Sequence, residues 1–344
     1  MKKPIAAASN FASLIIGSFV AAFITTLAGC SSMFQESDDA LIREPGQRTY
    51  KDPPENVSVS AHHLWEYAVL SDNIYLTSSI SQMAKSEEGK VCSLERTDRL
   101  KIEGWERWRD VPSSELQAEA EAVDLQLEIW EKQSSPHIVA VMFRGTEAQR
   151  IRDWISNFRW FLRFIPRYRD QYVLVSEKVG AAVLNKIKEQ LEKGDTRYKD
   201  VEIVSAGHSL GGGLAQHLAY SLPDDIKAPD GAMLPRVSAV YGFDPSPVTG
   251  WYSVPKNLRE QNARGLRIDR VFEHGEILSY IRLVLRYLNP PAEKDPAIRE
   301  IRYNFVTSLN PFSSHSMRLI ACELIKANGQ SVAPLRDPAK EAGK

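Results

Sequence analysis

Four short runs of apolar residues alternate with segments of helical periodicity over the central half of the chain. A run that is apolar throughout, rather than at every second position, predicts a strand buried on both faces, as in a parallel sheet. Alternation of such strands with helices predicts helices on both sides of that sheet. We therefore expect an α/β fold with a mostly parallel central sheet and helices on both faces. The runs are IVAVMF (138–143), VEIVSAG (201–207), VSAVYGF (237–243) and IDRVFEH (268–274), and the helical segments include KVGAAVLNKIKEQLEKG (178–194) and GGGLAQHLAYSL (211–222).

The rest of the chain has the composition of a folded, globular protein, since 43% of its 344 residues are apolar and 25% are charged. It shows no internal repeat and no second composition regime, so we expect one domain over residues 61–330. Residues 30–60 are rich in Ser, Asp, Glu, Pro and Gly, which predicts a flexible tether, and residues 331–344 are expected to be a disordered tail. A formal charge of -1 without a long Lys/Arg block argues against nucleic acid as a partner.

Outside the central runs, further elements are expected. Apolar residues at helical spacing from Leu64 predict a helix over 64–76, and an amphipathic helix is expected near the C-terminus in NPFSSHSMRLIACELI (310–325). Alternating patterns predict strands around Trp105 and over 123–130.

The N-terminus has the pattern of an export signal. Two lysines precede the apolar run 11–27, which ends in small residues and a cysteine at LAGC. A membrane-spanning anchor is the alternative, although glycine and hydroxyl residues interrupt the run. LAGC resembles the lipobox of bacterial lipoproteins, which implies a signal peptide over 1–29 and attachment to the membrane of the cell envelope through a lipidated Cys30. Ser31 resembles the residue at that position in lipoproteins sorted to the outer membrane.

Cysteines and histidines elsewhere do not predict a metal site. Cys92 and Cys322 could form a disulfide in an exported protein or be two separate buried residues, and the sequence leaves both open. His62 and His63 are adjacent but lack the HExxH spacing, so we interpret them as surface residues.

The motif GHSLG (207–211) places a serine at the change from a buried strand to a helix. In G-x-S-x-G the serine lies on a strained turn above the sheet, and glycines flank it because the strands and the helix leave no room for side chains. Glycine-rich turns can also bind phosphate, but neither the P-loop nor the dinucleotide-binding spacing is present. We therefore predict that Ser209 is a nucleophile.

A serine hydroxyl becomes nucleophilic when a histidine removes its proton and a carboxylate orients that histidine. After a turn of this kind, the acid and then the histidine follow the serine in the chain. His217 lies on the helix directly after the serine, whereas His315 lies on a turn-rich loop near the C-terminus and is the better candidate base. Asp244 follows the third strand and Glu276 follows the fourth, and the pattern alone leaves both as candidate acids.

An oxyanion hole is the other requirement, and it is built from backbone N–H groups. One comes from the residue after the nucleophile, here Leu210, and one from an earlier loop. FRGT (143–146) leaves a buried strand and turns at a glycine, so Thr146 is the candidate for the second group.

Together these motifs resemble the class 3 lipase family, the fungal-type triacylglycerol lipases of the α/β-hydrolase fold. The resemblance covers roughly residues 62–325 and rests on FRGT (143–146), DWISN (153–157), GHSLGG (207–212), VYGFDPSPV (240–248), RVFEHGEIL (270–278) and HSM (315–317). It implies Ser209 as nucleophile, His315 as base, Thr146 in the oxyanion hole and Glu276 as acid, where the family usually has Asp. It also implies hydrolysis of carboxylic esters, often of lipids, without a metal or an organic cofactor. Lipids such as phospholipids or acylglycerols are the expected substrates, because the expected anchor holds the enzyme beside them.

The resemblance further implies a mobile lid over FRWFLRFIPRYRDQY (158–172), whose aromatic and arginine side chains suit a lipid surface. Ordinary packing of these aromatics is the alternative, and EILSYIRLVLRYL (276–288) is a second segment of this kind, more typical of a helix that covers a core. Two other functions remain open, a hydrolase of small esters or thioesters and an envelope scaffold without turnover. The sequence does not indicate the oligomeric state, the acyl length or the head group.

Overall fold

The structure is a computed structural model that describes residues 36–76, 99–145, 170–279, 282, 292–306, 314–329 and 333–334. Its main strands are β1 (Ser37–Arg43), β2 (Glu55–Asn56), β4 (Trp105–Arg107), β5 (Leu127–Lys132), β6 (Ile138–Phe143), β7 (Glu202–His208), β8 (Val237–Phe243), β9 (Arg267–Glu273) and β10 (Ala297–Asn304). Its α-helices are α2 (Val57–Asn73), α3 (Ser114–Ala122), α5 (Gln171–Leu174), α6 (Gly180–Glu192), α7 (Leu210–Ser221), α8 (Lys256–Ala263) and α10 (Met317–Ala327). A π-helical turn, Val175–Val179, joins α5 to α6.

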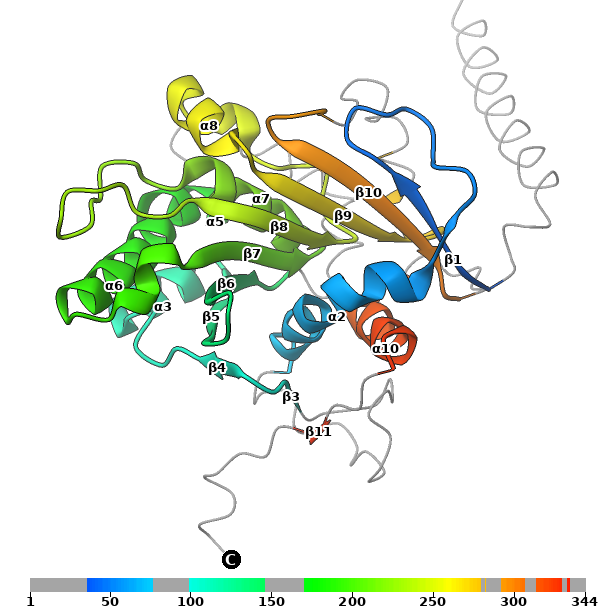
Figure 1. Ribbon diagram of the computed structural model, residues 1–344, viewed down its shortest axis with the longest axis horizontal. Coiled ribbons are helices and arrows are strands. Elements are labelled where there is room, and N and C mark those ends of the chain that lie inside the picture. Colours follow the sequence, from blue (N-terminus) through cyan, green and yellow to red (C-terminus); the bar gives the residue numbers. More distant parts are fainter. Residues whose placement is uncertain are drawn as a thin grey trace, which may run out of the picture.

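Nine of the described strands form one sheet in the order β2-β1-β10-β9-β8-β7-β6-β5-β4. The five strands from β6 to β10 are parallel, and the strands at both edges are antiparallel to their neighbours. Helices cover both faces (Figure 1), so the predicted α/β-hydrolase architecture is confirmed. The carboxyl ends of parallel strands share one edge of a sheet, and the segments that follow β7, β8 and β9 therefore emerge side by side.

β6, β7 and β8 are buried on both faces, as their continuous apolar runs predicted, whereas β9 is exposed or partly buried in its first half except at Ile268. In β6, Val139 and Val141 pack into the core on the side of α3, α6 and α7, whereas Ala140 and Met142 pack on the side of α2 and α10. Figure 1 shows α2 and α10 next to each other on the second face. Burial of one such aliphatic side chain stabilises the fold by about 1.5–3 kcal/mol, so the two cores hold the strand ends rigidly.

The expected flexible tether over residues 30–60 is wrong for its described part. β1 lies inside the sheet and pairs with β10, Ala40 and Ile42 are buried, and the buried guanidinium of Arg43 forms an ion pair with the partly exposed Glu300. Its first three residues are polar, and its second half supplies the side chains that enter the core. The folded domain therefore begins by Ser37.

Other boundaries also differ from the expectations. α2 begins earlier, because the side chain of Asn56 accepts the N–H of Ser58 and caps the helix. The strand expected over 123–130 starts at Leu127, after α3. In the expected tail, the short strand β11 (Ala333–Pro334) pairs with β3 (Leu100–Lys101).

Several predictions concern residues outside the described part of the chain. These are the signal peptide, Cys30, Cys92, Thr146, the expected lid up to residue 169 and most of 276–288. Cys322 is buried on α10. Among the described helices, none combines the length and the hydropathy that a membrane span requires.

Candidate active site

Ser209 lies between the end of β7 and the start of α7, and its backbone is strained. Its φ of 57° and ψ of -124° are a conformation that side chains rarely adopt. Two backbone hydrogen bonds hold it there, because the N–H of Ser209 donates to the carbonyl of Phe243 at 2.9 Å and its carbonyl accepts the N–H of Ser246 at 2.8 Å. The turn is therefore tied to the end of β8 on both sides of the serine.

The two glycines of the motif are required by close backbone contacts. A Cβ atom added to Gly207 would lie 2.5 Å from the carbonyl carbon of Gly211. A Cβ atom added to Gly211 would lie 2.2 Å from the carbonyl oxygen of Phe143. The obstructing atoms belong to the backbone and cannot move aside as a side chain could. Only glycine therefore fits at both positions, as the G-x-S-x-G motif predicts.

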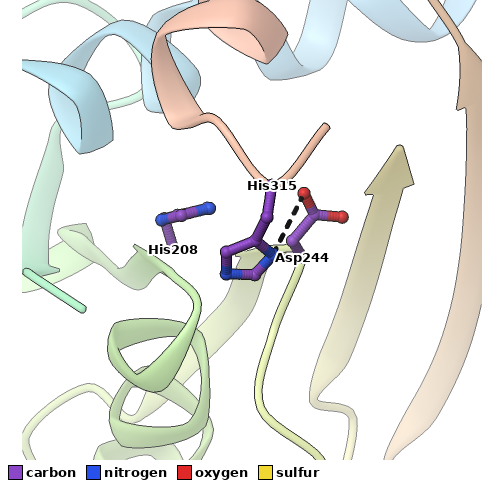
Figure 2. Close-up of side chains that lie close together, drawn as sticks. All are labelled: His208, Asp244 and His315. Carbon is purple, nitrogen blue, oxygen red and sulfur yellow. Dashed lines mark ion pairs between the residues drawn. The ribbon is translucent and has the colours of Figure 1, made fainter. Parts of the chain in front are cut away.

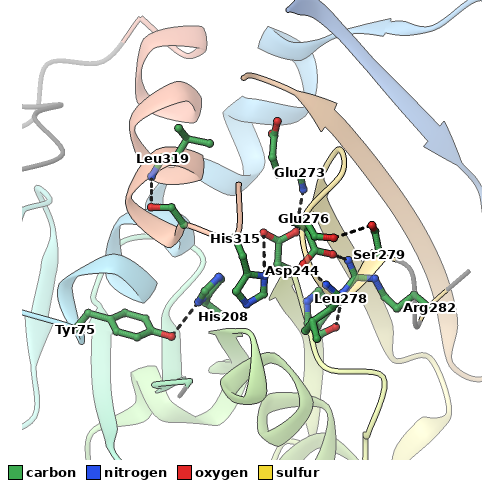
Figure 3. Close-up of polar contacts among 12 residues, drawn as sticks. Tyr75, His208, Asp244, Glu273, Glu276, Leu278, Ser279, Arg282, His315 and Leu319 are labelled. Carbon is green, nitrogen blue, oxygen red and sulfur yellow. Dashed lines mark hydrogen bonds and ion pairs between the residues drawn. The ribbon is translucent and has the colours of Figure 1, made fainter. Parts of the chain in front are cut away.

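His315 lies just before α10 and meets two carboxylates from the ends of β8 and β9 (Figure 3). Its Nδ1–H donates to Oε2 of Glu276 at 2.7 Å, whereas Oδ2 of Asp244 is 3.7 Å from the same nitrogen. Only the first distance is that of a hydrogen bond. The geometry therefore favours Glu276 as the group that orients His315.

Glu276 is fully buried and is held from several sides. The N–H of Leu278 donates to its Oε2 at 2.8 Å, and the guanidinium of Arg282 pairs with its Oε1. Arg282 also donates to the carbonyl of Pro245 at 2.9 Å and lies over the ring of Phe272. The carboxylate is thus fixed for a hydrogen bond to one imidazole.

Asp244 has a different environment from Glu276. Its φ is 41°, and its Oδ1 accepts the backbone N–H of Glu273 at 2.9 Å. Burial raises the pKa of Asp244 to about 7. Burial, together with the charge of Asp244, raises the pKa of Glu273 to about 8. A carboxyl group that holds its proton near neutral pH orients an imidazole less well than an ionised one.

His315 is kept neutral by its surroundings. Burial, followed by the charge of Arg282, lowers its pKa to about 3, so its Nε2 is available as a base at neutral pH. No described residue forms a hydrogen bond with that Nε2, and the hydrogen bond to Ser209 is therefore not formed in this structure. Catalytic hydrogen bonds are often long without substrate and tighten when it binds.

The loop that leaves β6 approaches the nucleophile closely. A Cβ atom added to Gly145 would lie 2.3 Å from the carbonyl of His208 and 2.9 Å from Cβ of Ser209. Leu210 is the first residue of α7, where N–H groups have no acceptor within the helix. Thr146 lies outside the described residues, so only the residue before it is placed beside the serine.

Sequence reasoning missed the hydroxyl that holds this loop. Tyr75, just after α2, accepts the N–H of Gly145 at 2.9 Å and is hydrogen-bonded to Nδ1 of His208 at 2.9 Å. It thereby joins the loop to the residue before the nucleophile. His208 was present in the motif as a variable position, and no local pattern marks Tyr75.

The other candidate histidine is not in the site. His217 is buried on α7, and its Nε2 is 3.0 Å from the carbonyl oxygen of Tyr172.

Comparison with known proteins gives one family match. Residues 140–271 match the model of the family described as Lipase (class 3), a segment that begins within β6, contains the turn at Ser209 and β8, and ends before Glu276 and His315. No curated protein matches the chain significantly.

Among solved structures, the triacylglyceride lipase of Rhizomucor miehei aligns with 18% identity over 70% of this chain and 77% of its own, with a TM-score of 0.37. Lipase II from Rhizopus niveus aligns with 14% identity over 65% of this chain and 76% of its own, with a TM-score of 0.35. This chain has the α/β-hydrolase architecture, and over residues 140–271 it is similar to the class 3 lipases.

Proposed function

We propose that this protein is a serine hydrolase that cleaves carboxylic esters of lipids through an acyl-enzyme intermediate. The observation that carries the proposal is the buried hydrogen bond from His315 to Glu276, in the same cluster as the strained turn at Ser209. The match to the class 3 lipase family supports the same chemistry.

In the first half of the reaction, Nε2 of His315 takes the proton of the Ser209 hydroxyl while its oxygen attacks the acyl carbon. Backbone N–H groups of Leu210 and Thr146 stabilise the oxyanion. The intermediate collapses when His315 gives the proton to the departing alcohol. Water, deprotonated by His315, then attacks the acyl-enzyme, and His315 gives that proton to the departing oxygen of Ser209 as the carboxylic acid is released. Glu276 holds the imidazole in both halves.

We further propose that Cys30 carries lipid and holds the enzyme at the outer membrane of a bacterial envelope. Phospholipids or acylglycerols would then lie beside the active site as substrates. Loss of radiolabelled palmitate incorporation in Cys30→Ala tests the anchor, and retained incorporation would contradict it.

A fluorophosphonate probe on the full-length chain in detergent tests the chemistry. We expect covalent labelling of Ser209 that is lost in Ser209→Ala, and a panel of phospholipids, triacylglycerols and short p-nitrophenyl esters should then identify the substrate class. Labelling with turnover of short esters alone would instead indicate a small-ester hydrolase. An unlabelled, folded chain would indicate a scaffold without turnover.

A further inference from the structure

Asp244 is held in an uncommon backbone conformation at the end of β8. Its φ of 41° is positive, and among the non-glycine residues that the structure describes only Asp124 and Ser209 share this feature. Its N–H donates to the carbonyl of Val271 at 2.7 Å, and its Oδ1 accepts the N–H of Glu273 at 2.9 Å. Both partners lie on β9. Backbone strain of this kind persists mainly at functional sites, which indicates a role for the carboxyl group.

These contacts leave Oδ2 of Asp244 facing His315 (Figure 2). Oδ2 lies 3.7 Å from Nδ1 of His315, and both side chains are excluded from solvent. It forms no hydrogen bond with any residue that the structure describes. The Nδ1 hydrogen is donated to Glu276, so the contact with Asp244 is electrostatic rather than a second hydrogen bond. Charges at this distance interact strongly where water is excluded, and the charge of Asp244 therefore acts on His315.

The charges around His315 are unequal once it accepts a proton. Proton transfer from Ser209 gives the imidazole a positive charge, and the guanidinium of Arg282, which is paired with Glu276, is a second positive charge beside it. These two cations face one carboxylate. An ionised Asp244 supplies a second negative charge, which favours the charged form of the imidazole.

The other ionisable groups around Asp244 differ from it in the pH at which they change charge. Burial, followed by the charges of His315 and Arg282, lowers the pKa of His208 well below its ordinary value, so this ring stays neutral near neutral pH. Burial lowers the pKa of Arg282 only to about 9. Burial, followed by the charge of Asp244, raises the pKa of Glu273 to about 8. Burial raises the pKa of Asp244 to about 7, although the charge of Arg282 opposes the rise, so Asp244 ionises first as pH rises through neutrality.

We propose that Asp244 is a positioning residue for His315, and that its ionised carboxylate stabilises the imidazolium that forms when Ser209 gives up its proton. Glu276 remains the acid that orients the ring, whereas Asp244 adds negative charge without a hydrogen bond. Turnover should therefore rise as Asp244 loses its proton. The contact between the two side chains is independent of hydrolysis, whereas its effect on turnover rests on the proposed function.

The effect on turnover is tested by measuring kcat on a soluble ester from about pH 5 to about pH 8.5. We expect kcat of the native chain to rise about fivefold around pH 7 with little change in KM, because Arg282 offsets part of the attraction. Asp244→Asn should keep the low rate throughout, since an amide carries no charge. Glu273→Gln is the matched control, because it removes the other raised carboxyl group and keeps the backbone N–H that Asp244 accepts. The rise should remain in that variant.

The contact itself is tested without turnover, by NMR of the full-length Ser209→Ala chain in detergent with ¹⁵N-labelled histidine. The Nδ1–H resonance of His315 is identified by its loss in His315→Gln. It should shift with a midpoint near pH 7, as Asp244 ionises. Addition of Asp244→Asn should abolish the shift.

The proposal is overturned if native kcat is level across pH 7, or if the rise persists in folded Asp244→Asn. A rise that disappears in Glu273→Gln alone would assign the effect to Glu273 instead. If Asp244→Asn does not fold, the NMR titration of the parent decides, and a His315 resonance that does not move near pH 7 refutes the contact. A chain that fluorophosphonate does not label, but whose His315 resonance shifts as expected, would refute the hydrolase and leave the electrostatic contact established.

Discussion

Nδ1 of His315 and Oε2 of Glu276 lie 2.7 Å apart, and both side chains are excluded from solvent. The longer side chain of glutamate, entering from the end of β9, reaches the imidazole, whereas Asp244 stops 3.7 Å away. A carboxylate at this position selects the tautomer in which Nε2 is the base.

Glu276→Gln should therefore lower kcat by about 10³–10⁴-fold, because an amide does not stabilise the imidazolium that forms during catalysis. Asp244→Asn should lower kcat less than tenfold, since its amide oxygen still accepts the N–H of Glu273. Steady-state kinetics on one ester, with circular dichroism to verify folding, compare the two. A large loss confined to Asp244→Asn would assign the acid to Asp244 instead.

Tyr75→Phe should lower kcat about tenfold with little change in KM. The change leaves the N–H of Gly145 without its acceptor, which costs about 1–3 kcal/mol and loosens the loop expected to stabilise the oxyanion. Tyr67→Phe is the matched control, because Tyr67 lies on the preceding helix and stacks on Tyr241. Equal losses in the two variants would show that the hydroxyl at position 75 has no special role in this loop.

Arg282→Met should move the acid limb of the kcat/KM profile to higher pH. The positive charge of Arg282 disfavours a second positive charge on His315 and contributes to its low pKa, so removal of the charge raises that pKa. Burial is the larger cause, and the shift is therefore partial. Arg299→Met, which removes an ion pair with Asp269, should leave the limb in place, and a limb that stays fixed in both variants would refute the electrostatic link.

Between pH 6.5 and 8 the free energy of unfolding should fall as pH rises. The folded protein holds the Asp244 proton up to about pH 7 and the Glu273 proton up to about pH 8, whereas their ordinary pKa values are 3.8 and 4.5. The folded state thus binds more protons than the unfolded state in this range, and stability is lost as they dissociate. The lowered pKa of His315 acts in the opposite direction, but below pH 6.5.

Urea unfolding at several pH values measures this dependence. Asp244→Asn should show a smaller loss between pH 6.5 and 8, because one of the two raised carboxyl groups is removed. Profiles with the same slope in the native chain and the variant would contradict the assignment.

Gly211→Ala should destabilise the fold by about 3 kcal/mol, because the new methyl group meets the backbone of Phe143. Gly265→Ala adds a methyl group with no neighbour within 4 Å, at a φ of 71°. That change should cost only about 1 kcal/mol of backbone strain. Thermal unfolding compares them, and a larger effect at position 265 would mean that crowding around Gly211 is relieved by movement of the turn.

The parallel centre of the sheet could be predicted because β6, β7 and β8 are almost continuously apolar and buried on both faces. β10 was missed because charged residues lie between its buried ones, as in Glu300 and Arg302 beside Ile301, and β1 was missed because it begins with three polar residues. From the sequence alone, such a pattern is typical of a surface segment. The pairing of β1 with β10 is what identifies both as strands.

At the site, the order of Ser209 and His315 along the chain was enough to nominate them. The choice between Asp244 and Glu276 was not available from the residues alone, because adjacent parallel strands deliver both carboxylates to the same edge, and side-chain length decides between them. The role of Tyr75 could not be predicted, because its hydrogen-bond partner His208 is 133 positions away in the sequence.

The place of β1 in the sheet has a consequence for an anchored enzyme. β1 runs antiparallel to β10, and its first residue, Ser37, pairs with Asn304 at the carboxyl end of that strand. The chain thus enters the domain at the rim from which Ser209, Asp244 and Glu276 emerge. Ser37 is seven positions after Cys30, and a fully extended chain of that length spans at most about 25 Å. A lipid on that cysteine would hold the edge of the sheet that carries the active site close to the bilayer and facing it.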